Sequence, residues 1–485
     1  MKILLFVNLA IDCGYEGVNH GLAWLAPVVR AHGYDVRCIN LTQAITVAEL
    51  IDRVTYLNPA IIGFSATTHQ LSCLRLYAQA VRPMKAILIA GGVGVTLDPD
   101  WVLTQTVVDG ACIGEGEGPI GALLKRLEAN KDPSMTPGFW WRKAGAEVQK
   151  NPPPPFEHNL DVLSPPDYSF YDRKAVVSGE GHLFVMLSRG CPYNCYYCCN
   201  KALQGVYETS HGYFRVPSVE YCIRVLENLV REYPETKAIE FEDDLLIANR
   251  EWFLDFAEQY RKRVGLPYRV CVRVECVKPD IVKALKDSGC CRVLLGLESG
   301  NEVFRKKYLN RAYSNKLLVE KCRMLRKADL DLFTFNIVGF PLEGAREMRD
   351  TLRLNQQAKP DGGVCTFFYP YKHTQLHKIC EENGVLLDEK DLGTITNYNS
   401  RPAIRMSDDL SKTCVDYQRK ITTYLEHRRL LWRIAHGPGP LPRVLKRFVS
   451  PTWYASFMNP DGTLYQCVRA VYRACGVRKL FHYGK

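Results

Sequence analysis

The sequence lacks any apolar run of the ~18 residues that a membrane-spanning helix requires. Its longest candidate, Ala86–Leu97, has 12 residues, and three of them are glycines. It also lacks internal repeats and low-complexity segments, which excludes solenoids and collagen-like or disordered chains. Hydrophobic residues make up 47% and charged residues 24% of the 485 positions, so we expect a globular protein of roughly three domains.

We do not expect the first residues to be a secretion signal. The N-terminus has one lysine and a short apolar stretch that Asp12 ends, without a clear cleavage site, which predicts a buried first strand. The 19 cysteines are odd in number and scattered along the chain. We therefore expect no disulfide framework, but a cytoplasmic protein that uses a few thiols for metal or redox chemistry.

Net positive charge is scarce except at the C-terminal end. The net charge is +11, but 11 Lys or Arg residues and only two acids lie between Ile421 and Lys485. The remainder is nearly neutral, which is unlike a general nucleic-acid binder. These cations alternate with Trp432, Trp453 and Phe457, a mixture that suits either a helical lid over the substrate pocket or an interfacial helix on anionic lipid. The second reading predicts a protein at the membrane periphery with a lipid-like substrate.

Apolar runs alternate with helical patterns along most of the chain, which predicts an α/β protein. We expect an N-terminal doubly wound parallel sheet, a proline-rich linker with a short hairpin strand at 138–143, a complete or partial (β/α) barrel of six units, and a small basic helical region. The predicted boundaries of these four parts are 1–130, 131–180, 181–390 and 391–485. Ligands of such sheets bind beyond the carboxyl ends of the strands.

The strands predicted for the N-terminal sheet are Ile3–Asn8, Asp35–Asn40, Ala60–Ser65, Ala86–Ala90 and Gly110–Ile113. Those predicted for the barrel are Leu183–Leu187, Ala238–Phe241, Arg269–Val274, Arg292–Leu295, Leu332–Ile337 and Cys365–Tyr369.

The strongest functional signal is a cysteine cluster directly after the first barrel strand. Cys191, Cys195 and Cys198 have the spacing Cys-x3-Cys-x2-Cys. Three thiolates on one loop can hold three corners of an iron–sulfur cube and leave the fourth iron open. Zinc is the alternative, with Cys199 as a candidate fourth ligand, although structural zinc sites usually use two short pairs.

This loop, with Tyr197 before the third cysteine, resembles the radical S-adenosylmethionine (SAM) superfamily. The resemblance implies that the three cysteines hold a 4Fe-4S cluster whose open iron binds the amino and carboxylate groups of SAM. An electron delivered by a donor such as flavodoxin or ferredoxin would then release a 5′-deoxyadenosyl radical that abstracts a substrate hydrogen.

The later strand ends also resemble that family. They carry polar residues or glycines at the positions where members of that family contact the amino group, the ribose or carboxylate, and the adenine of SAM. The resemblance implies SAM contacts at Tyr197, Glu242, Asp243, Arg273, Glu298, Ile337 and Gly339. The segment from Phe368 to Thr374 is similar to the family's F-x-P-Y-x-G-T segment, but His373 stands in place of its glycine.

The N-terminal domain resembles cobalamin-binding domains, which carry D-x-H-x-x-G, then S-x-T, then G-G after successive strands. A Gly-Glu-Gly-Glu segment after the fifth strand is also common in cobalamin-dependent radical SAM enzymes. The resemblance implies cobalamin contacts at Asp12, Gly14, Ser65, Thr67, Gly91, Gly92 and Glu115. Gly14 replaces the cobalt-ligating histidine, so we predict no lower axial histidine. A Rossmann-like domain that binds a nucleotide or nothing is the alternative.

The combined resemblance covers about residues 1–390 and implies an enzyme that modifies an unactivated carbon, by methyl transfer in the leading hypothesis. A cobalamin-dependent cyclase, oxidase or rearrangement enzyme without methyl transfer is the second hypothesis. A non-catalytic iron–sulfur or zinc sensor is the hypothesis from another class. The sequence identifies neither the substrate nor a catalytic residue that acts on it.

The cysteine assignment can be tested directly. After anaerobic reconstitution the protein should hold about four irons and cleave SAM to 5′-deoxyadenosine under strong reductant. Replacement of Cys191, Cys195 and Cys198 by alanine should abolish both properties, whereas Cys199→Ala should retain nearly all iron. Cleavage of SAM by the triple variant would contradict the assignment.

Overall fold

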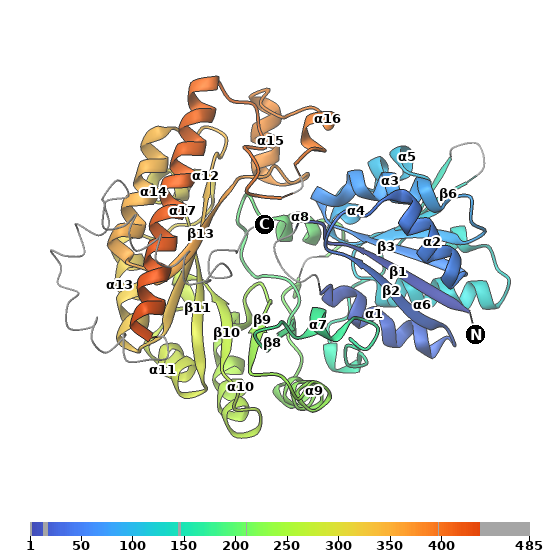
Figure 1. Ribbon diagram of the computed structural model, residues 1–485, viewed down its shortest axis with the longest axis horizontal. Coiled ribbons are helices and arrows are strands. Elements are labelled where there is room, and N and C mark those ends of the chain that lie inside the picture. The colour runs from blue at the N-terminus through green and yellow to red at the C-terminus, as the bar shows by residue number, and fades with distance from the viewer. Residues whose placement is uncertain (1, 13–17, 144–146, 210, 396, 437–485) are drawn as a thin grey trace, which may run out of the picture.

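The computed structural model describes residues 2–12, 18–143, 147–209, 211–395 and 397–436. Two sheets, each covered by helices, form two lobes that meet along a central interface (Figure 1). Within these described ranges no helix is long and apolar enough to cross a membrane.

The first sheet has seven strands in the order β2-β1-β3-β4-β5-β6-β7. The first five run parallel, as predicted, and β6 and β7 form an antiparallel hairpin at one edge. The strands are β1 Ile3–Leu9, β2 Asp35–Leu41, β3 Ile61–Ala66, β4 Ile87–Gly91, β5 Gly110–Cys112, β6 Phe139–Arg142 and β7 Val148–Lys150. Trp141 of the hairpin pairs with Gly110 of β5, so the sheet continues to Lys150, into the stretch where the sequence predicted a linker.

Helices cover both faces of this sheet, which makes it doubly wound as predicted (Figure 1). Apolar residues from α1 and α6 fill one side, and those from α2, α3 and α5 fill the other. In α2, for example, Leu50 and Val54 are buried one turn apart, as an amphipathic helix requires. The helices are α1 His20–Ala31, α2 Val47–Leu57, α3 Leu71–Val81, α4 Val93–Leu97, α5 Pro99–Gln105 and α6 Glu117–Glu128, with a 3-10 turn η1 at Thr68–Gln70.

The second sheet has six parallel strands in the order β13-β12-β11-β10-β9-β8. Strands that follow one another in chain order, with helices on the outside, form a partial barrel. The strands are β8 His182–Val185, β9 Ala238–Phe241, β10 Tyr268–Val272, β11 Cys290–Glu298, β12 Asp331–Val338 and β13 Gly362–Phe367. The prediction of a partial barrel is therefore confirmed.

Most of the outer helices of this lobe bury their apolar faces against the sheet in one large core, whereas Phe304 of α12 lies in a separate, smaller cluster. The outer helices are α9 Val219–Glu232, α10 Arg250–Arg263, α11 Pro279–Asp287, α12 Glu302–Tyr308, α13 Asn315–Lys327 and α14 Ala345–Ala358. Short helices complete the lobe at α7 Arg173–Val176, α8 Cys199–Gln204, α15 Gln375–Glu382 and α16 Glu389–Leu392.

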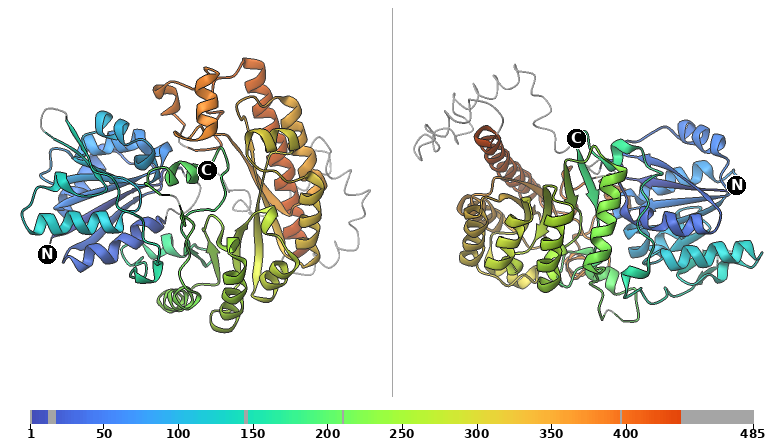
Figure 2. Two further views of the ribbon diagram at one scale, coloured as in Figure 1. Left: turned by 180° about the vertical axis from the view of Figure 1, so that it is seen from behind. Right: turned by 90° about the horizontal axis from the view of Figure 1, so that it is seen from below.

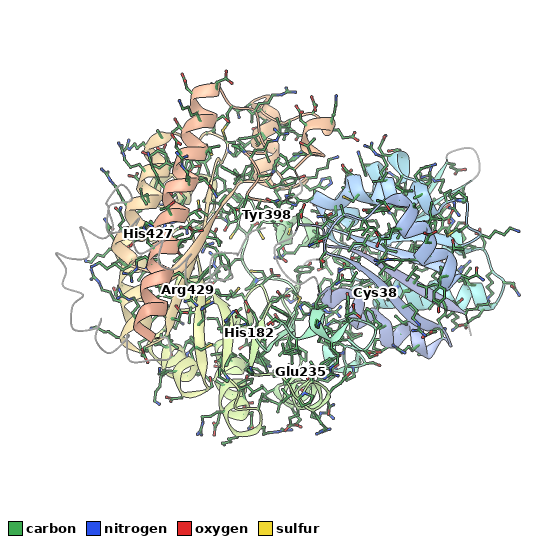
Figure 3. All side chains as sticks on the ribbon, viewed as in Figure 1. Cys38, His182, Glu235, Tyr398, His427 and Arg429 are labelled. Atoms are coloured by element: carbon green, nitrogen blue, oxygen red, sulfur yellow. The ribbon has the colours of Figure 1, made fainter. Side chains whose placement is uncertain are left out.

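A long C-terminal helix, α17 Asp408–His436, lies along β13 and α14 (Figures 1 and 2). Arg429, which Figure 3 labels near this helix, pairs with Asp331 at 2.8 Å. The Nε of Arg428 donates to the Pro360 carbonyl at 2.7 Å. Two of the cations considered for a lipid surface therefore hold this helix to the sheet. Trp453 and Phe457, and the side chain of Trp432, lie outside the part of the chain that the structure describes.

Candidate active site

The residues that follow the strands of both sheets meet at the interface between the lobes (Figure 1). Helix α8, which begins at Cys199, packs against α4 of the first lobe. His20, which begins α1 after β1, lies 2.8 Å from Glu242, which follows β9. Since ligands of parallel sheets bind beyond the carboxyl ends of the strands, the two predicted binding regions face each other.

The three clustered cysteines lie on the loop between β8 and α8, with Cys195 buried and Cys191 and Cys198 half-buried. We call residues 186–198 the cysteine loop. Burial raises the pKa of Cys191 to about 12, and the neighbouring Cys198 and Cys195 contribute to this shift. The cysteines within the described residues are free thiols.

The side chains around the loop do not form a site for a single metal ion. Within the described ranges, no three His, Cys, Asp or Glu side chains are grouped closely enough to hold one. Tetrahedral zinc needs ligands at about 2.0–2.3 Å. The guanidinium of Arg273 donates to the Cys195 sulfur at 2.9 Å and would stabilise a thiolate there, the form in which cysteine binds an iron–sulfur cluster.

Arg273 follows β10, as predicted, and belongs to a compact charged group. Its side chain lies over the Tyr193 ring at 3.8 Å and pairs with Glu275 at 2.8 Å. It is 8% exposed. A buried cation at this position lowers the cost of collecting negative charge on the cysteine loop.

Glu298 ends β11 in the left-handed backbone region, with φ of 65°. Arg311 bonds its carboxylate at 3.0 Å and the Tyr197 hydroxyl at 2.9 Å, so two buried side chains and the half-buried Tyr197 form one network. Burial raises the pKa of Glu298, although Arg311 opposes that shift. This network joins the cysteine loop to the end of β11, and two of its members were predicted SAM contacts.

Asp243 is 1% exposed and fastens the start of the cysteine loop. Its Oδ1 accepts hydrogen bonds from the backbone N–H groups of Leu187 and Ser188 and from the Ser188 hydroxyl. Burial raises its pKa to about 6, and its Oδ2 has no hydrogen-bond partner among the described residues. Glu242, the neighbouring residue, is more open and turns toward the first lobe.

The segment after β12 is shaped by a buried carboxyl group. Glu343 accepts hydrogen bonds from the N–H groups of Gly339 at 2.6 Å and Phe340 at 3.2 Å. Burial raises the pKa of Glu343 to about 8. Ile337 is half-buried on β12 in the apolar cluster that also contains Tyr197, so the predicted adenine region and the cysteine loop share one wall.

In the first lobe, the loops after β3 and β4 pack tightly together. A side chain at Gly92, where φ is 100°, would meet the Ala66 carbonyl oxygen at 2.8 Å, so the fold itself requires this glycine. At Gly91 the nearest atom would be an ordinary 3.7 Å away. Packing therefore does not explain Gly91, which fits a site where a bulky ligand approaches the backbone.

The other predicted cobalamin residues have varied surroundings. Ser65 accepts a hydrogen bond from Asn19 at 2.8 Å and is buried, whereas Thr67 is half-buried and Asp12 is exposed. Gly14 lies outside the described residues. Glu115 pairs with Arg189 at 2.8 Å instead of standing free beside the sheet.

A cavity of about 260 Å³ opens between the lobes, beside η1 and α15. Leu97 and Trp101 line it from the first lobe, and Leu386 and Leu392 line it from the second. His373 has φ of 63°, which explains why the similar family uses glycine there, and its Nε2 contacts the Leu97 carbonyl at 3.0 Å.

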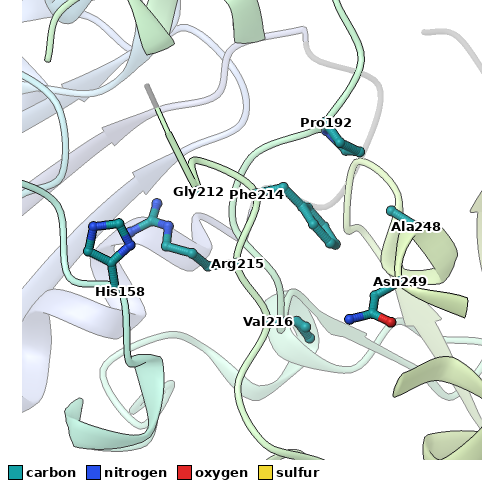
Figure 4. Close-up of a pocket in the computed structure, with 8 residues that line it drawn as sticks. All are labelled: His158, Pro192, Gly212, Phe214, Arg215, Val216, Ala248 and Asn249. Carbon is teal, nitrogen blue, oxygen red and sulfur yellow. The ribbon is translucent and has the colours of Figure 1, made fainter. Parts of the chain in front are cut away.

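An aromatic cluster stands beside this cavity. The ring of His69 lies 4.0 Å from that of Tyr369 and 4.3 Å from that of Tyr398. Burial lowers the pKa of His69 to about 4, so it is a neutral imidazole at neutral pH. A second hollow, of about 420 Å³, borders the cysteine loop at Pro192 and is also lined by Arg215 (Figure 4).

Sequence reasoning found Arg273 but missed three other arginines of the site, Arg189, Arg215 and Arg311. Arg189 stands two residues before the first cysteine, a position that could have drawn attention. Arg311 and Arg215 follow no strand and have no characteristic spacing from the motifs, so only the folded chain reveals them.

Comparisons with known proteins agree with this geometry. The sequence model of the B12 binding domain matches residues 8–124, and that of the radical SAM superfamily matches residues 185–354. The first implies cobalamin, and the second implies a 4Fe-4S cluster and SAM. These cofactors replace the zinc and nucleotide alternatives that the sequence left open.

Relatives and solved structures span both lobes. An uncharacterised methyltransferase of Pyrococcus horikoshii is 27% identical over 80% of this chain and 84% of its own. The anaerobic magnesium-protoporphyrin IX monomethyl ester cyclase of Cereibacter sphaeroides is 24% identical over 89% of this chain and 72% of its own. The structure of the cobalamin-dependent S-adenosylmethionine radical enzyme OxsB has a TM-score of 0.67 at 16% identity, over 98% of this chain and 75% of that one, which establishes the fold.

The buried carboxyl group of Glu343 predicts a pH effect on stability. Its folded pKa of about 8 lies above the unfolded value of ~4.3, so the folded state binds more protons between these values. Stability should therefore fall as pH rises through this window, by at most ~1.4 kcal/mol per pH unit. Glu343→Gln keeps an oxygen acceptor for both N–H groups and should remove this contribution.

Urea unfolding from pH 5 to 8.5 measures the effect. Glu258→Gln, on the exposed side of α10, is the matched control and should keep the wild-type pH dependence. An identical pH dependence in Glu343→Gln and the wild type would contradict the prediction.

Proposed function

We propose that this cobalamin-dependent radical SAM enzyme, in which a B12-binding domain precedes a radical SAM domain, methylates an unactivated carbon of its substrate. When bound, SAM at the cluster supplies a hydrogen-abstracting radical, and cobalamin relays a methyl group. The observation that carries the proposal is the contact between α8, at the end of the cysteine loop, and α4, at the carboxyl edge of the first sheet. This contact lets both cofactors serve one substrate.

One relative supports methyl transfer over other radical reactions. The Pyrococcus horikoshii protein, a methyltransferase by its description, matches 80% of this chain and most of its own length. Cyclisation without methyl transfer is the second candidate, because the Cereibacter sphaeroides cyclase aligns with 89% of the chain.

The residues around the cysteine loop would bind and orient SAM. We propose that Arg273 neutralises the negative charge that gathers at the thiolates and the SAM carboxylate. Arg311 would hold Glu298 and Tyr197 in fixed positions, so that this carboxylate can meet the polar part of SAM and the ring can flank its adenine. Asp243 would act indirectly, because its hydrogen bonds go to the start of the loop. Ile337 and Gly339 would form the wall beside the adenine.

In the first lobe, Gly91 and Gly92 would lie under the corrin, and Asp12, Ser65 and Thr67 would line its edge. The mainly apolar cavity between the lobes suggests that at least part of the substrate is apolar. The cyclase relative is named for a protoporphyrin ester, which is a large ring, and this agrees with the proposal.

Methyl transfer and cyclisation differ in what becomes of SAM. A methyltransferase of this kind should convert SAM to S-adenosylhomocysteine when its cobalamin is reduced, even without substrate, because methylation of the corrin is a polar displacement that needs no substrate radical. Anaerobic reduction of the loaded protein with SAM, followed by chromatography, measures this product. The triple cysteine variant should form no 5′-deoxyadenosine. If the wild type forms 5′-deoxyadenosine alone, the cyclase or rearrangement hypothesis is favoured instead.

If the cavity binds an apolar part of the substrate, an apolar probe should label it selectively. An apolar aryl diazirine, photolysed with the loaded protein, should label peptides that contain Leu97, Trp101 and Leu386. Leu387→Trp fills part of the cavity and should lower this labelling, because the added ring takes the volume the probe needs. Leu76→Trp, at an exposed position of α3, is the control. Equal labelling of both variants would contradict an apolar binding site here.

A further inference from the structure

Four charged side chains connect the two lobes on one side of the cysteine loop. Arg189 pairs with Glu115 at 2.8 Å and with Glu117 at 2.5 Å. Arg215 binds the same Glu115 carboxylate with two nitrogens. The glutamates belong to the segment after β5 in the first lobe, and the arginines belong to the second. We call these four residues the interlobe ion network.

The network is withdrawn from water. Arg215 is 5% exposed, and the side chains of Arg189 and Glu117 are 15% and 12% exposed. Burial alone would raise the pKa of Glu115, but hydrogen bonds and charge from Arg215 and Arg189 hold it below its ordinary value. A desolvated carboxylate with bidentate guanidinium partners is costly to unpair, so these groups resist separation of the lobes.

The arginines are fastened to the cysteine loop through the backbone. Arg189 and Arg215 exchange two backbone hydrogen bonds of 2.8 and 2.9 Å. Only Gly190, with φ of 75°, separates Arg189 from Cys191, and a side chain at Gly190 would clash with the Tyr213 ring at 2.7 Å. The position of the first cysteine therefore follows the position of Arg189.

The glutamates are fastened in the same way to the first sheet. The backbone N–H of Gly114, next to Glu115, donates to the Thr96 hydroxyl of α4 at 3.1 Å, and Glu117 begins α6. The backbone N–H of Glu115 itself donates to the Tyr207 hydroxyl of the second lobe at 2.8 Å. On the other side of the loop, His20 meets Glu242 at 2.8 Å, which adds a polar contact between the lobes there. The loop is thus held against the first lobe from both sides.

We propose that Glu115 and Glu117 are positioning residues that set the distance between the 4Fe-4S cluster and the corrin, rather than ligands of cobalamin. Both oxygens of Glu115 are already engaged by arginine, which leaves the carboxylate directed at the second lobe. The proposal rests on the proposed function only in that the two cofactors must face one substrate.

The test measures magnetic coupling instead of turnover. In protein loaded with both cofactors, the reduced cluster should speed the electron spin relaxation of cob(II)alamin, to an extent that depends on their separation. Glu117→Gln and the Glu115→Gln/Glu117→Gln double variant should retain iron and cobalamin. They should lose part of this relaxation enhancement, the double variant more than the single one.

Three controls separate positioning from general damage. Glu227→Gln removes a carboxylate, 30% exposed, that pairs with Arg263 inside the second lobe, and it should leave the coupling unchanged. Arg189→Lys keeps the positive charge but lacks the planar guanidinium that binds a carboxylate with two nitrogens, so it should weaken the coupling mildly. This variant tests the proposal even if the double variant fails to fold. All variants without the cluster should show one common cobalt relaxation rate.

Two results would overturn the proposal. One is an unchanged relaxation enhancement in Glu117→Gln and Arg189→Lys. The other is a loss of cobalamin from the glutamate variants while the coupling in the remaining loaded protein stays the same, which would indicate direct contact with the corrin. Neither result depends on the formation of S-adenosylhomocysteine, which tests methyl transfer. The positioning role of the network and the proposed methyl transfer can therefore be disproved independently.

Discussion

The pairing of Arg189 with two carboxylates from the other lobe is the contact on which the geometry of the molecule most depends. A guanidinium remains charged at any physiological pH, so burial leaves it no alternative to a partner. Its partners, Glu115 and Glu117, come from the segment after β5, and no residue of its own lobe replaces them in the contacts that the structure describes. Separation of the lobes would therefore leave several buried charges unpaired at once.

Around the cysteines, the buried arginines would balance the negative charge of bound cofactors instead of pairing across the two lobes. An iron–sulfur cluster held by thiolates and a SAM carboxylate would gather negative charge in a space with little water. Arg273 and Arg311 are both buried there, and each contacts a residue of the cysteine loop. Because charges interact more strongly when water is excluded, two fixed cations contribute more at this position than they would on the surface.

The glycines of the first lobe show that a glycine required by the fold can be distinguished from one that is better explained by a bound ligand. Gly92 is required by the approach of the Ala66 backbone, whether or not a ligand binds. Gly91 has no such neighbour, and so its missing side chain is better explained by something outside the chain. Similarly, the left-handed backbone at His373 gives a reason for glycine in similar sequences that does not involve binding.

The sequence by itself determined the α/β class, nearly all of the strands and the three cysteines, because periodicity and short-range spacing are local properties. It also placed Arg273 and Glu298 at strand ends, where parallel sheets collect their functional residues. Only the tertiary structure decided that the hairpin at β6 and β7 joins the first sheet, and that Arg429 packs against Asp331 instead of remaining a surface cation. The same holds for Arg311 and the interlobe ion network, because their partners lie far away in the chain and come together only when the two lobes pack.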